Sequence, residues 1–333
     1  MPYIAKMIAT RFIGTKLLDN YRESLKILQS QPNSNEIEEY HALLSVSKAL
    51  SSWYSMAGIQ AVRESLGGHG YSAHAGIGRL RNTQDLHTTW EGDNVILMQQ
   101  TAKFVVKSVQ KKMTGKEVNK SVQFLNPDFE SVHQYRPRFT TIEELLNHDL
   151  LISLLEYKVN YLAGLSIEKL RENATSNFIE SWNRTQVFYL QNLSKAFGEL
   201  EMARAFWSYT PEATNPTTQV FKTCWFVFCL VSIHENMSLY LEQQCLAAPQ
   251  VRLVENALNK LIDEVAAVSV RLFDVIGIKD FLHGSVLGRE DGQVYAELIR
   301  RTEADPECYK KASWVDTLLR LRETGKVLRS NTR

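Results

Sequence analysis

Apolar residues recur at helical spacing along most of the chain, and short polar or proline-containing stretches interrupt this pattern. Because residues three and four apart lie on one face of a helix, this period predicts amphipathic helices. No stretch alternates apolar and polar residues as strands do, and the chain has no internal repeat. We predict helices over the ranges 3–30, 35–66, 93–112, 141–171, 176–208, 215–246, 250–276, 292–303 and 308–324.

The predicted helices fall into two groups. The stretch between them, residues 114–140, is polar, contains proline and has no helical period, which is typical of a linker. We therefore predict an all-α fold with two consecutive helical bundles, residues 1–113 and residues 141–326. A turn is expected at residues 31–35, where Pro32 interrupts the first group.

The composition is that of a soluble globular protein with a sizeable core, since 44% of the residues are apolar and 23% charged. A net charge of +1 gives no reason to expect nucleic acid or a membrane surface as a partner. No apolar run approaches the roughly 18 residues that cross a bilayer. The longest candidate, residues 224–233, is interpreted as a core helix in which Trp225, Phe226 and Phe228 form a buried stripe.

Metal chemistry has no support in the sequence. The four cysteines form no CxxC pair, and the eight histidines show no ligand spacing. His234-Glu235 lacks the second histidine of a zinc-binding HExxH motif, and no two helices carry the Glu-x-x-His pairs of a di-metal bundle. We predict no metal site and a reduced, intracellular protein.

Six of the 16 glycines lie between residues 67 and 92, between two predicted helices. Such a concentration indicates backbone that takes unusual dihedral angles or passes close to a ligand. It begins with Gly67-Gly68-His69-Gly70-Tyr71, whose backbone N–H groups suit an anionic or flat ligand such as a pyrophosphate. Two glycines after a helix are also an ordinary stop signal. The motif alone leaves both interpretations open.

A second motif, Trp90-Glu91-Gly92-Asp93-Asn94, precedes the next predicted helix. A carboxylate beside a large apolar ring can be held partly desolvated, which suits it to act as a general base. The alternative is that Asp93 or Asn94 only caps the helix and that Glu91 is exposed. The residues themselves do not decide between the two.

Together the two motifs resemble the acyl-CoA oxidase branch of the acyl-CoA dehydrogenase superfamily. That branch typically has Gly-Gly-His-Gly-Tyr, then Tyr- or Phe-Glu-Gly-Asp/Glu-Asn, then a Gln-Thr-Ala helix, which Gln100-Thr101-Ala102 matches. The similarity covers nearly the whole chain and is closest to the branched-chain (pristanoyl) type. It also rests on Pro2-Tyr3-Ile4-Ala5, Ser47-Lys48, residues 53–60 and 273–276, Asp280-Phe281, Gly288, Asp291-Gly292 and Tyr295.

The resemblance implies that Glu91 is the catalytic base, which removes the α-proton of a fatty acyl-CoA while the β-hydrogen leaves as hydride to FAD. The product is a trans-2-enoyl-CoA, and dioxygen is reduced to hydrogen peroxide. Stabilising the enolate-like charge needs donors aimed at the thioester oxygen. In the family these are the backbone N–H of the same glutamate and a flavin hydroxyl. Trp90 would wall the substrate pocket, and Gly92 would let the chain turn beside it.

The resemblance also assigns the flavin contacts and the setting. Residues 67–94 would form the flavin and active-site loop, in which Gly67 and Gly68 approach the FAD of a neighbouring subunit, so that a homodimer is expected. Asp93 and Asn94 would lie near the FAD of their own subunit. The family is usually peroxisomal, although the chain ends without the common peroxisomal tripeptide.

A full member of this family also has an N-terminal helical domain and a β-barrel domain, which supply most flavin and CoA contacts. Nothing in this chain resembles them. We therefore expect the chain alone to bind FAD weakly or not at all and to have little activity. The alternative function is a non-catalytic helical interaction module that keeps the motif by descent.

Overall fold

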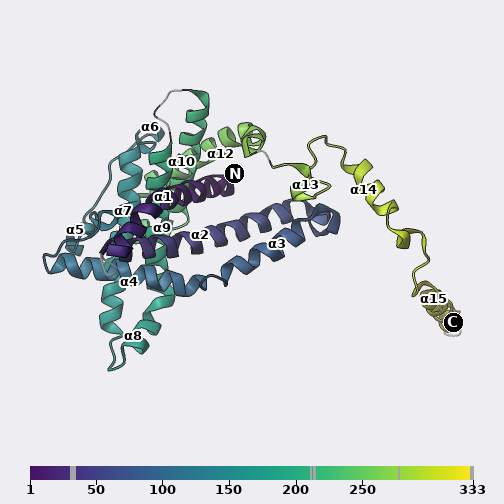
Figure 1. Cartoon of the computed structure of the whole chain (residues 1–333), viewed down its shortest axis with the longest axis horizontal. Coiled ribbons are helices and arrows are strands. Elements are labelled where there is room, and N and C mark those ends of the chain that lie inside the picture. The colour runs from purple at the N-terminus through teal and green to yellow at the C-terminus, as the bar shows by residue number, and fades with distance from the viewer. Residues whose placement is uncertain (31–34, 211, 213–214, 277, 331–333) are drawn as a thin grey trace. The chain divides into compact units, whose positions relative to one another are not determined.

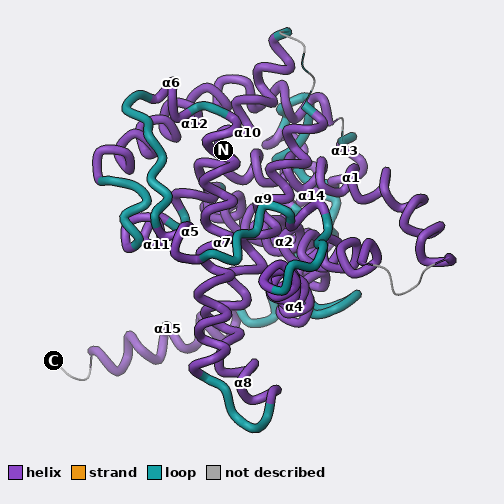
Figure 2. The backbone as a smooth tube through the Cα atoms, turned by 90° about the vertical axis from the view of Figure 1, so that its left-hand side faces the viewer, coloured by secondary structure: helices purple, strands orange, loops and turns teal. Residues whose placement is uncertain are grey.

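Every regular element in the described part of the chain is a helix. The computed structural model describes residues 1–30, 35–210, 212, 215–276 and 278–330. Figure 2 shows no strand in these ranges, and the prediction of an all-α fold is confirmed. The helices are α1 (Pro2–Ser30), α2 (Asn35–Ser65), α3 (Ile77–Asp85), α4 (Asn94–Met113), α5 (Phe129–His133), α6 (Ile142–Leu145), α7 (His148–Glu172), α8 (Phe178–Thr185), α9 (Gln191–Tyr209), α10 (Pro216–His234), α11 (Met237–Glu242), α12 (Ala248–Ile276), α13 (Asp280–His283), α14 (Val294–Glu303) and α15 (Val315–Ser330).

The chain divides into two compact units. The larger unit comprises residues 1–64 and 80–277, and the smaller one residues 65–79 together with the chain from residue 278 onward. The predicted boundaries of 1–113, 114–140 and 141–326 stay a prediction.

Helix α9 lies at the centre of the larger unit, where it contacts α1, α4 and α7 (Figure 1). Twelve of its 19 residues are buried, as expected for a helix with neighbours on several sides. Gly198 marks its closest approach to α2, since a Cβ atom there would lie 2.4 Å from Val46 Cγ2. Helices from both predicted bundles thus share one hydrophobic core.

Helix α10 carries the predicted core stripe and packs against α1, α7 and α12. Trp225 and Phe228 are buried and Phe226 is partly buried, so this expectation is confirmed. The helix starts where sequence signals favour a start. Pro216 occupies its first turn, and the Asn215 side chain accepts a hydrogen bond from the Thr218 backbone N–H.

A charged cluster crosses this core. Lys158 of α7 donates to Glu199 of α9 at 2.7 Å, and both side chains are only 1% exposed. Tyr54 of α2 and Ser232 of α10 also donate to the Glu199 carboxylate, at 2.8 and 2.6 Å. Lys195 lies 3.7 Å from the same carboxylate. Four helices are therefore joined through one buried glutamate.

The pKa of Glu199 shows which influence dominates in this cluster. Burial raises the pKa of the carboxyl, but Lys158, Lys195 and the hydrogen bond from Ser232 outweigh burial. The net effect lowers the pKa from 4.5 to about 2. Glu199 is therefore ionised at neutral pH, because its compensating partners are in place.

Several predicted helix limits are wrong. The 141–171 helix is divided into α6 and α7, because Asn147 takes an extended conformation and caps α7 by accepting from the Leu150 N–H. The 215–246 helix ends at His234, and α11 begins only after Asn236. The 308–324 helix starts at Val315 and reaches Ser330. Residues 31–34 of the predicted turn lie outside the described residues.

Several further elements were not predicted. The glycine-rich segment contains α3, together with short 3-10 turns at Gly67–Tyr71, Ala73–Ala75 and Leu86–Thr88. The predicted 176–208 helix includes a π turn at Gln186–Leu190, in which Gln191 N–H donates to the carbonyl five residues back. Other 3-10 turns lie at Lys120–Val122 and Pro306–Tyr309.

Helix α7 modifies the expectation about membranes. It is the one helix in the described ranges that is long and apolar enough to cross a bilayer by length and composition. However, 61% of its most apolar window is buried inside the molecule, which is typical of a core helix. Glu156 and Lys158 interrupt its apolar residues, so α7 is not the uninterrupted apolar run that the sequence prediction concerned.

Candidate active site

The turn that carries Glu91 joins the Leu86–Thr88 3-10 turn to α4. Trp90 N–H donates to the Leu86 carbonyl at 3.1 Å, and the chain then reverses through two residues with positive φ. Glu91 has a φ of 53° and Gly92 a φ of 103°. A residue other than glycine takes the left-handed conformation only at a cost of roughly 1–2 kcal/mol. The turn therefore needs neighbours that hold Glu91 in place.

Asp93 caps α4, as one of the two interpretations of the motif predicts. Its Oδ1 accepts hydrogen bonds from the backbone N–H groups of Val95 and Ile96, at 2.9 and 3.3 Å. Its second carboxylate oxygen has no hydrogen-bond partner in the part of the chain that the structure describes. The cap fixes where α4 begins, and it thereby fixes the position of Asn94, the first residue of the helix.

Asn94 is buried and fastens the start of α4 to α2. Its Nδ2 donates to Ser52 Oγ at 2.9 Å and to the Ala49 carbonyl at 3.4 Å. Its Oδ1 accepts from Lys48 Nζ at 2.9 Å. Both ends of the amide are therefore bound within the chain.

Lys48 reaches the turn from α2. Besides Asn94, it donates to the Gly92 carbonyl at 2.6 Å. Burial lowers the pKa of Lys48, and the carboxylates of Asp93 and Glu91 act in the opposite direction. The sequence analysis named Ser47-Lys48 as part of the family resemblance but gave Lys48 no role at the site.

Glu91 itself is exposed, and so is Trp90, with 43% of its surface accessible. The Trp90 indole donates to His87 Nδ1 at 2.9 Å, and its ring meets the His87 ring edge to face at 5.0 Å. The expectation that the indole keeps Glu91 partly dry is therefore wrong for this chain by itself, because the ring turns to His87.

The arrangement leaves two groups of Glu91 available to a ligand. Among the described residues, nothing accepts a hydrogen bond from the Glu91 backbone N–H, and nothing pairs with its carboxylate. Gly92 allows this arrangement, since a Cβ atom there would lie 3.0 Å from Leu97 Cδ2 at an unfavourable φ. A carboxylate and a free N–H on one residue can bind a proton donor and an oxygen of the same molecule.

The Gly67–Tyr71 turn belongs to the smaller unit. Gly67, two residues after α2 ends at Ser65, has a φ of 55°, which is the conformation of a helix-terminating glycine. A Cβ atom at Gly67 or Gly68 would meet nothing within 4 Å. Neither glycine is required by close packing within the described chain, so their outer face is open to a ligand or partner.

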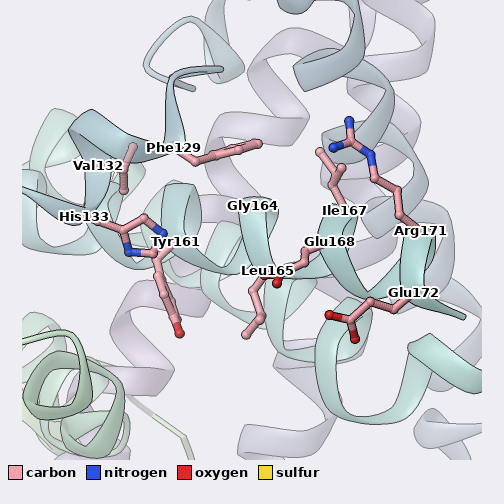
Figure 3. Close-up of a pocket in the computed structure, with 10 residues that line it drawn as sticks. All are labelled: Phe129, Val132, His133, Tyr161, Gly164, Leu165, Ile167, Glu168, Arg171 and Glu172. Atoms are coloured by element: carbon pink, nitrogen blue, oxygen red, sulfur yellow. The ribbon is translucent and has the colours of Figure 1, made fainter.

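The larger unit also contains a cavity of about 360 Å³ between α5 and α7 (Figure 3). His133 and Tyr161 lie at one end, with ring centroids 5.6 Å apart, and Arg171 and Glu172 lie at the other. No predicted site residue lines it. The complete lining is Phe129, Val132, His133, Tyr161, Gly164, Leu165, Ile167, Glu168, Arg171 and Glu172.

Potential metal ligands are not grouped in this fold. Across the described ranges, no three His, Cys, Asp or Glu side chains are arranged to hold a metal ion. Cys224, Cys229 and Cys245 are buried and unpaired, and burial raises the pKa of Cys224 to about 11 and that of Cys245 to about 12. These thiols are therefore protonated at neutral pH.

Comparison with known proteins gives matches along most of the chain. The family described as "Acyl-CoA oxidase, C-alpha1 domain" matches residues 1–106, and the family described as "Acyl-CoA oxidase" matches residues 147–322. Peroxisomal acyl-coenzyme A oxidase 3 of Homo sapiens is 28% identical over 327 residues, which cover 94% of this chain and 47% of that protein.

Two solved structures share the fold. An acyl-CoA oxidase from tomato (Lycopersicon esculentum) has a TM-score of 0.87 at 23% identity, over 96% of this chain and 50% of that one. Acyl-CoA oxidase-2 from Caenorhabditis elegans, bound with FAD, ascaroside-CoA and ATP, has a TM-score of 0.84 at 23% identity, over 98% and 48% of the two chains. The chain thus spans about half the length of the curated relatives it matches.

Proposed function

The chain belongs to the acyl-CoA oxidase family, and we propose that it supplies the catalytic base for α,β-desaturation of a fatty acyl-CoA. Glu91 would accept the substrate α-proton, and the product would be a trans-2-enoyl-CoA. Bound FAD would supply the hydride acceptor, and dioxygen the final electron acceptor that becomes hydrogen peroxide. The reaction is a step of fatty acid β-oxidation.

One observation carries this proposal. The Glu91 carboxylate and the Glu91 backbone N–H are both unused within the described chain, on a turn that Lys48 and Asp93 hold. The carboxylate would take the α-proton while the N–H donates to the thioester oxygen. The two functions support each other, because charge develops on that oxygen as the proton leaves.

The residues that the resemblance assigns to the flavin fit it in part, each within its own unit. Gly67 and Gly68 would hold FAD through their backbone, since a ligand finds open space beside both. Asp93 keeps one carboxylate oxygen for a flavin contact. Asn94 suits a direct contact less well, because its amide is bound to Lys48, Ala49 and Ser52. Its role near FAD would then be to place the start of α4.

The proposed reaction requires that further polypeptide shield Glu91 from water. General base catalysis of this kind works best where water is excluded, whereas Glu91 and Trp90 are exposed here. We propose that further polypeptide, in a homodimer or from the part of the relatives that this chain does not span, covers the turn, with Trp90 and Gly92 beside the thioester. A peroxisomal location is proposed from the names of the relatives.

The exposed apolar side chains favour a second candidate function. Leu86, Trp90 and Ile96 are exposed around the turn, with fractions of 50%, 43% and 53%. An apolar surface of this kind also suits a helical interaction module without catalytic activity. The two candidates differ in whether the Glu91 carboxylate is needed.

The test is acyl-CoA-dependent formation of hydrogen peroxide with added FAD. It uses the purified chain, both alone and with the N-terminal half of a full-length acyl-CoA oxidase supplied in trans. Glu91→Gln is expected to lower the rate by at least about 100-fold, the usual contribution of a general base. Glu117→Gln, another exposed glutamate, serves as the matched control. Equal rates for Glu91→Gln and the control would refute the enzyme and leave the interaction module.

A further inference from the structure

Lys48 connects α2 to the Glu91 turn. Its ammonium donates to the Gly92 carbonyl at 2.6 Å and to Asn94 Oδ1 at 2.9 Å. The carboxylates of Asp93 and Glu91 act on it electrostatically, and both favour the protonated ammonium. A half-buried lysine therefore lies among three consecutive residues that follow the candidate base, although it is 43 positions earlier in the chain (91 − 48).

The contact with Gly92 acts on the part of the turn that is hardest to hold. Glu91 is one of two described residues other than glycine with a positive φ. Its carboxylate and its N–H have no partner in the described chain, so neither of them fixes the conformation. The Gly92–Asp93 peptide group is fixed by the hydrogen bond from Lys48 to the Gly92 carbonyl. The start of α4 is fixed by the Asp93 cap.

We propose that Lys48 is a positioning residue for the reaction, which holds the Glu91–Gly92 turn so that the Glu91 carboxylate and N–H face the same substrate. This rests on the proposed function of Glu91. Lys48 itself touches neither the substrate nor the reacting atoms. Its ammonium acts through the Gly92 carbonyl, and its charge keeps two neighbouring carboxylates from repelling each other out of the turn.

A purely structural role, in which Lys48 only fastens α4 to α2, would have a different signature. Asn94 already joins the two helices through Ser52 and Ala49, and Thr101 does so further along, by donating to the Ala42 carbonyl at 3.0 Å. Loss of Lys48 therefore removes one of several bonds between the helices. It removes the single side-chain bond that the described structure gives to the Gly92 carbonyl.

The first readout is the backbone order of the isolated chain, measured by NMR relaxation. In Lys48→Met, the order parameters of the Glu91 and Gly92 N–H groups are expected to fall from about 0.85 to below about 0.6. Those of Met98 and Thr101 in α4 should stay unchanged. Lys107→Met, which removes an exposed lysine of α4 paired with Glu38, is the matched control. An unchanged turn, or a general loosening of α4, would overturn the proposal.

The second readout is the kcat of peroxide formation in the chain complemented in trans. Loss of a hydrogen bond from a charged donor predicts a fall in kcat of about 10- to 100-fold in Lys48→Met, with KM nearly unchanged. If Glu91→Gln abolishes peroxide formation while Lys48→Met retains the wild-type kcat, the proposed role of Lys48 is refuted and the proposed function of Glu91 is supported. If Glu91→Gln is as active as wild type, the proposed function fails, and the role of Lys48 fails with it.

Restoring an ammonium group at position 48 distinguishes loss of positioning from misfolding as the cause of the Lys48→Met effect. Lys48→Cys is made together with Cys308→Ser, which removes the exposed cysteine, and is then alkylated with 2-bromoethylamine to give a lysine analogue. The three other cysteines are buried and less accessible to the reagent. Recovery of turn order and kcat on alkylation supports the proposal. A correctly alkylated protein that stays disordered at Glu91 and Gly92 would overturn it.

Discussion

Replacing Lys158 with methionine would leave the Glu199 carboxylate buried without its closest cation. The Lys158 ammonium lies 2.7 Å from Glu199 Oε2 and 2.7 Å from Ser232 Oγ. Methionine has nearly the same length and fills the same space in the core, so the change removes charge and donors with little change in packing. The remaining ammonium, Lys195, is 3.7 Å away and 36% exposed.

The magnitude follows from two features of the structure. Breaking a buried ion pair by removing one partner costs about 3–5 kcal/mol. Since Tyr54, Ser232 and Lys195 still stabilise Glu199, we expect the lower end of that range, about 3 kcal/mol. The direction of the Glu199 pKa agrees, because Lys158 and Lys195 lower it in spite of burial and so stabilise the ionised form.

The assay is the free energy of unfolding from urea titration at neutral pH, followed by circular dichroism. Lys107→Met is the control, because Lys107 also pairs with a glutamate, Glu38, but the two side chains are 47% and 42% exposed. An exposed pair contributes about 0–1 kcal/mol. The reasoning would be refuted if Lys158→Met cost no more than Lys107→Met, since burial is the main difference between the two pairs.

Two other predictions concern the same core. The folded-state pKa of Glu199 lies below its unfolded value, so its contribution to the free energy of unfolding is present above pH 4.5 and is lost as the pH falls toward about 2. Urea titrations across that window should show a loss of about 3 kcal/mol in wild type and a smaller loss in Glu199→Gln. The same dependence of unfolding free energy on pH in both proteins would contradict the assignment. Gly198→Ala should destabilise by about 1–3 kcal/mol, because its Cβ would lie 2.4 Å from Val46 Cγ2 and 2.6 Å from Leu50 Cδ1. Gly14→Ala, in open space on α1, should instead stabilise by roughly 0.5–1 kcal/mol, and the reverse order in thermal melts would show that α9 can shift away from α2.

The long helices could be predicted from the sequence because their apolar faces recur with a clear period. The break after His234 could not, since no proline or glycine marks it. There, the Asn236 side chain donates back to the Ser232 carbonyl, and Tyr240 donates to the Leu154 carbonyl of α7, which draws α11 out of line. The first contact is local, but the second depends on a tertiary neighbour that a local pattern does not contain.

The candidate site shows the same limit. The motif predicts a turn at Glu91 and a cap at Asp93, because both depend on residues next to each other in the chain. It does not predict Lys48, which reaches Gly92 only once α2 and α4 are packed together. It also left the surroundings of Glu91 open, because the contact of Trp90 with His87 decides where the indole points.

The π turn between α8 and α9 sets the phase of two contacts with α4. Trp182 donates to Gln99, and Ser194 donates to the Met98 carbonyl, although the two residues are twelve positions apart (194 − 182). In a regular helix this spacing would point them about 120° apart, whereas one extra residue in the turn brings them to within roughly 20°. Straightening this turn at unchanged length would therefore leave a regular helix that can satisfy Gln99 or Met98 but not both, whereas deleting one residue from 186–190 would bring the two donors to eleven positions apart and keep them in phase. The extra residue in the π turn is what keeps both donors of the α8–α9 segment directed at α4.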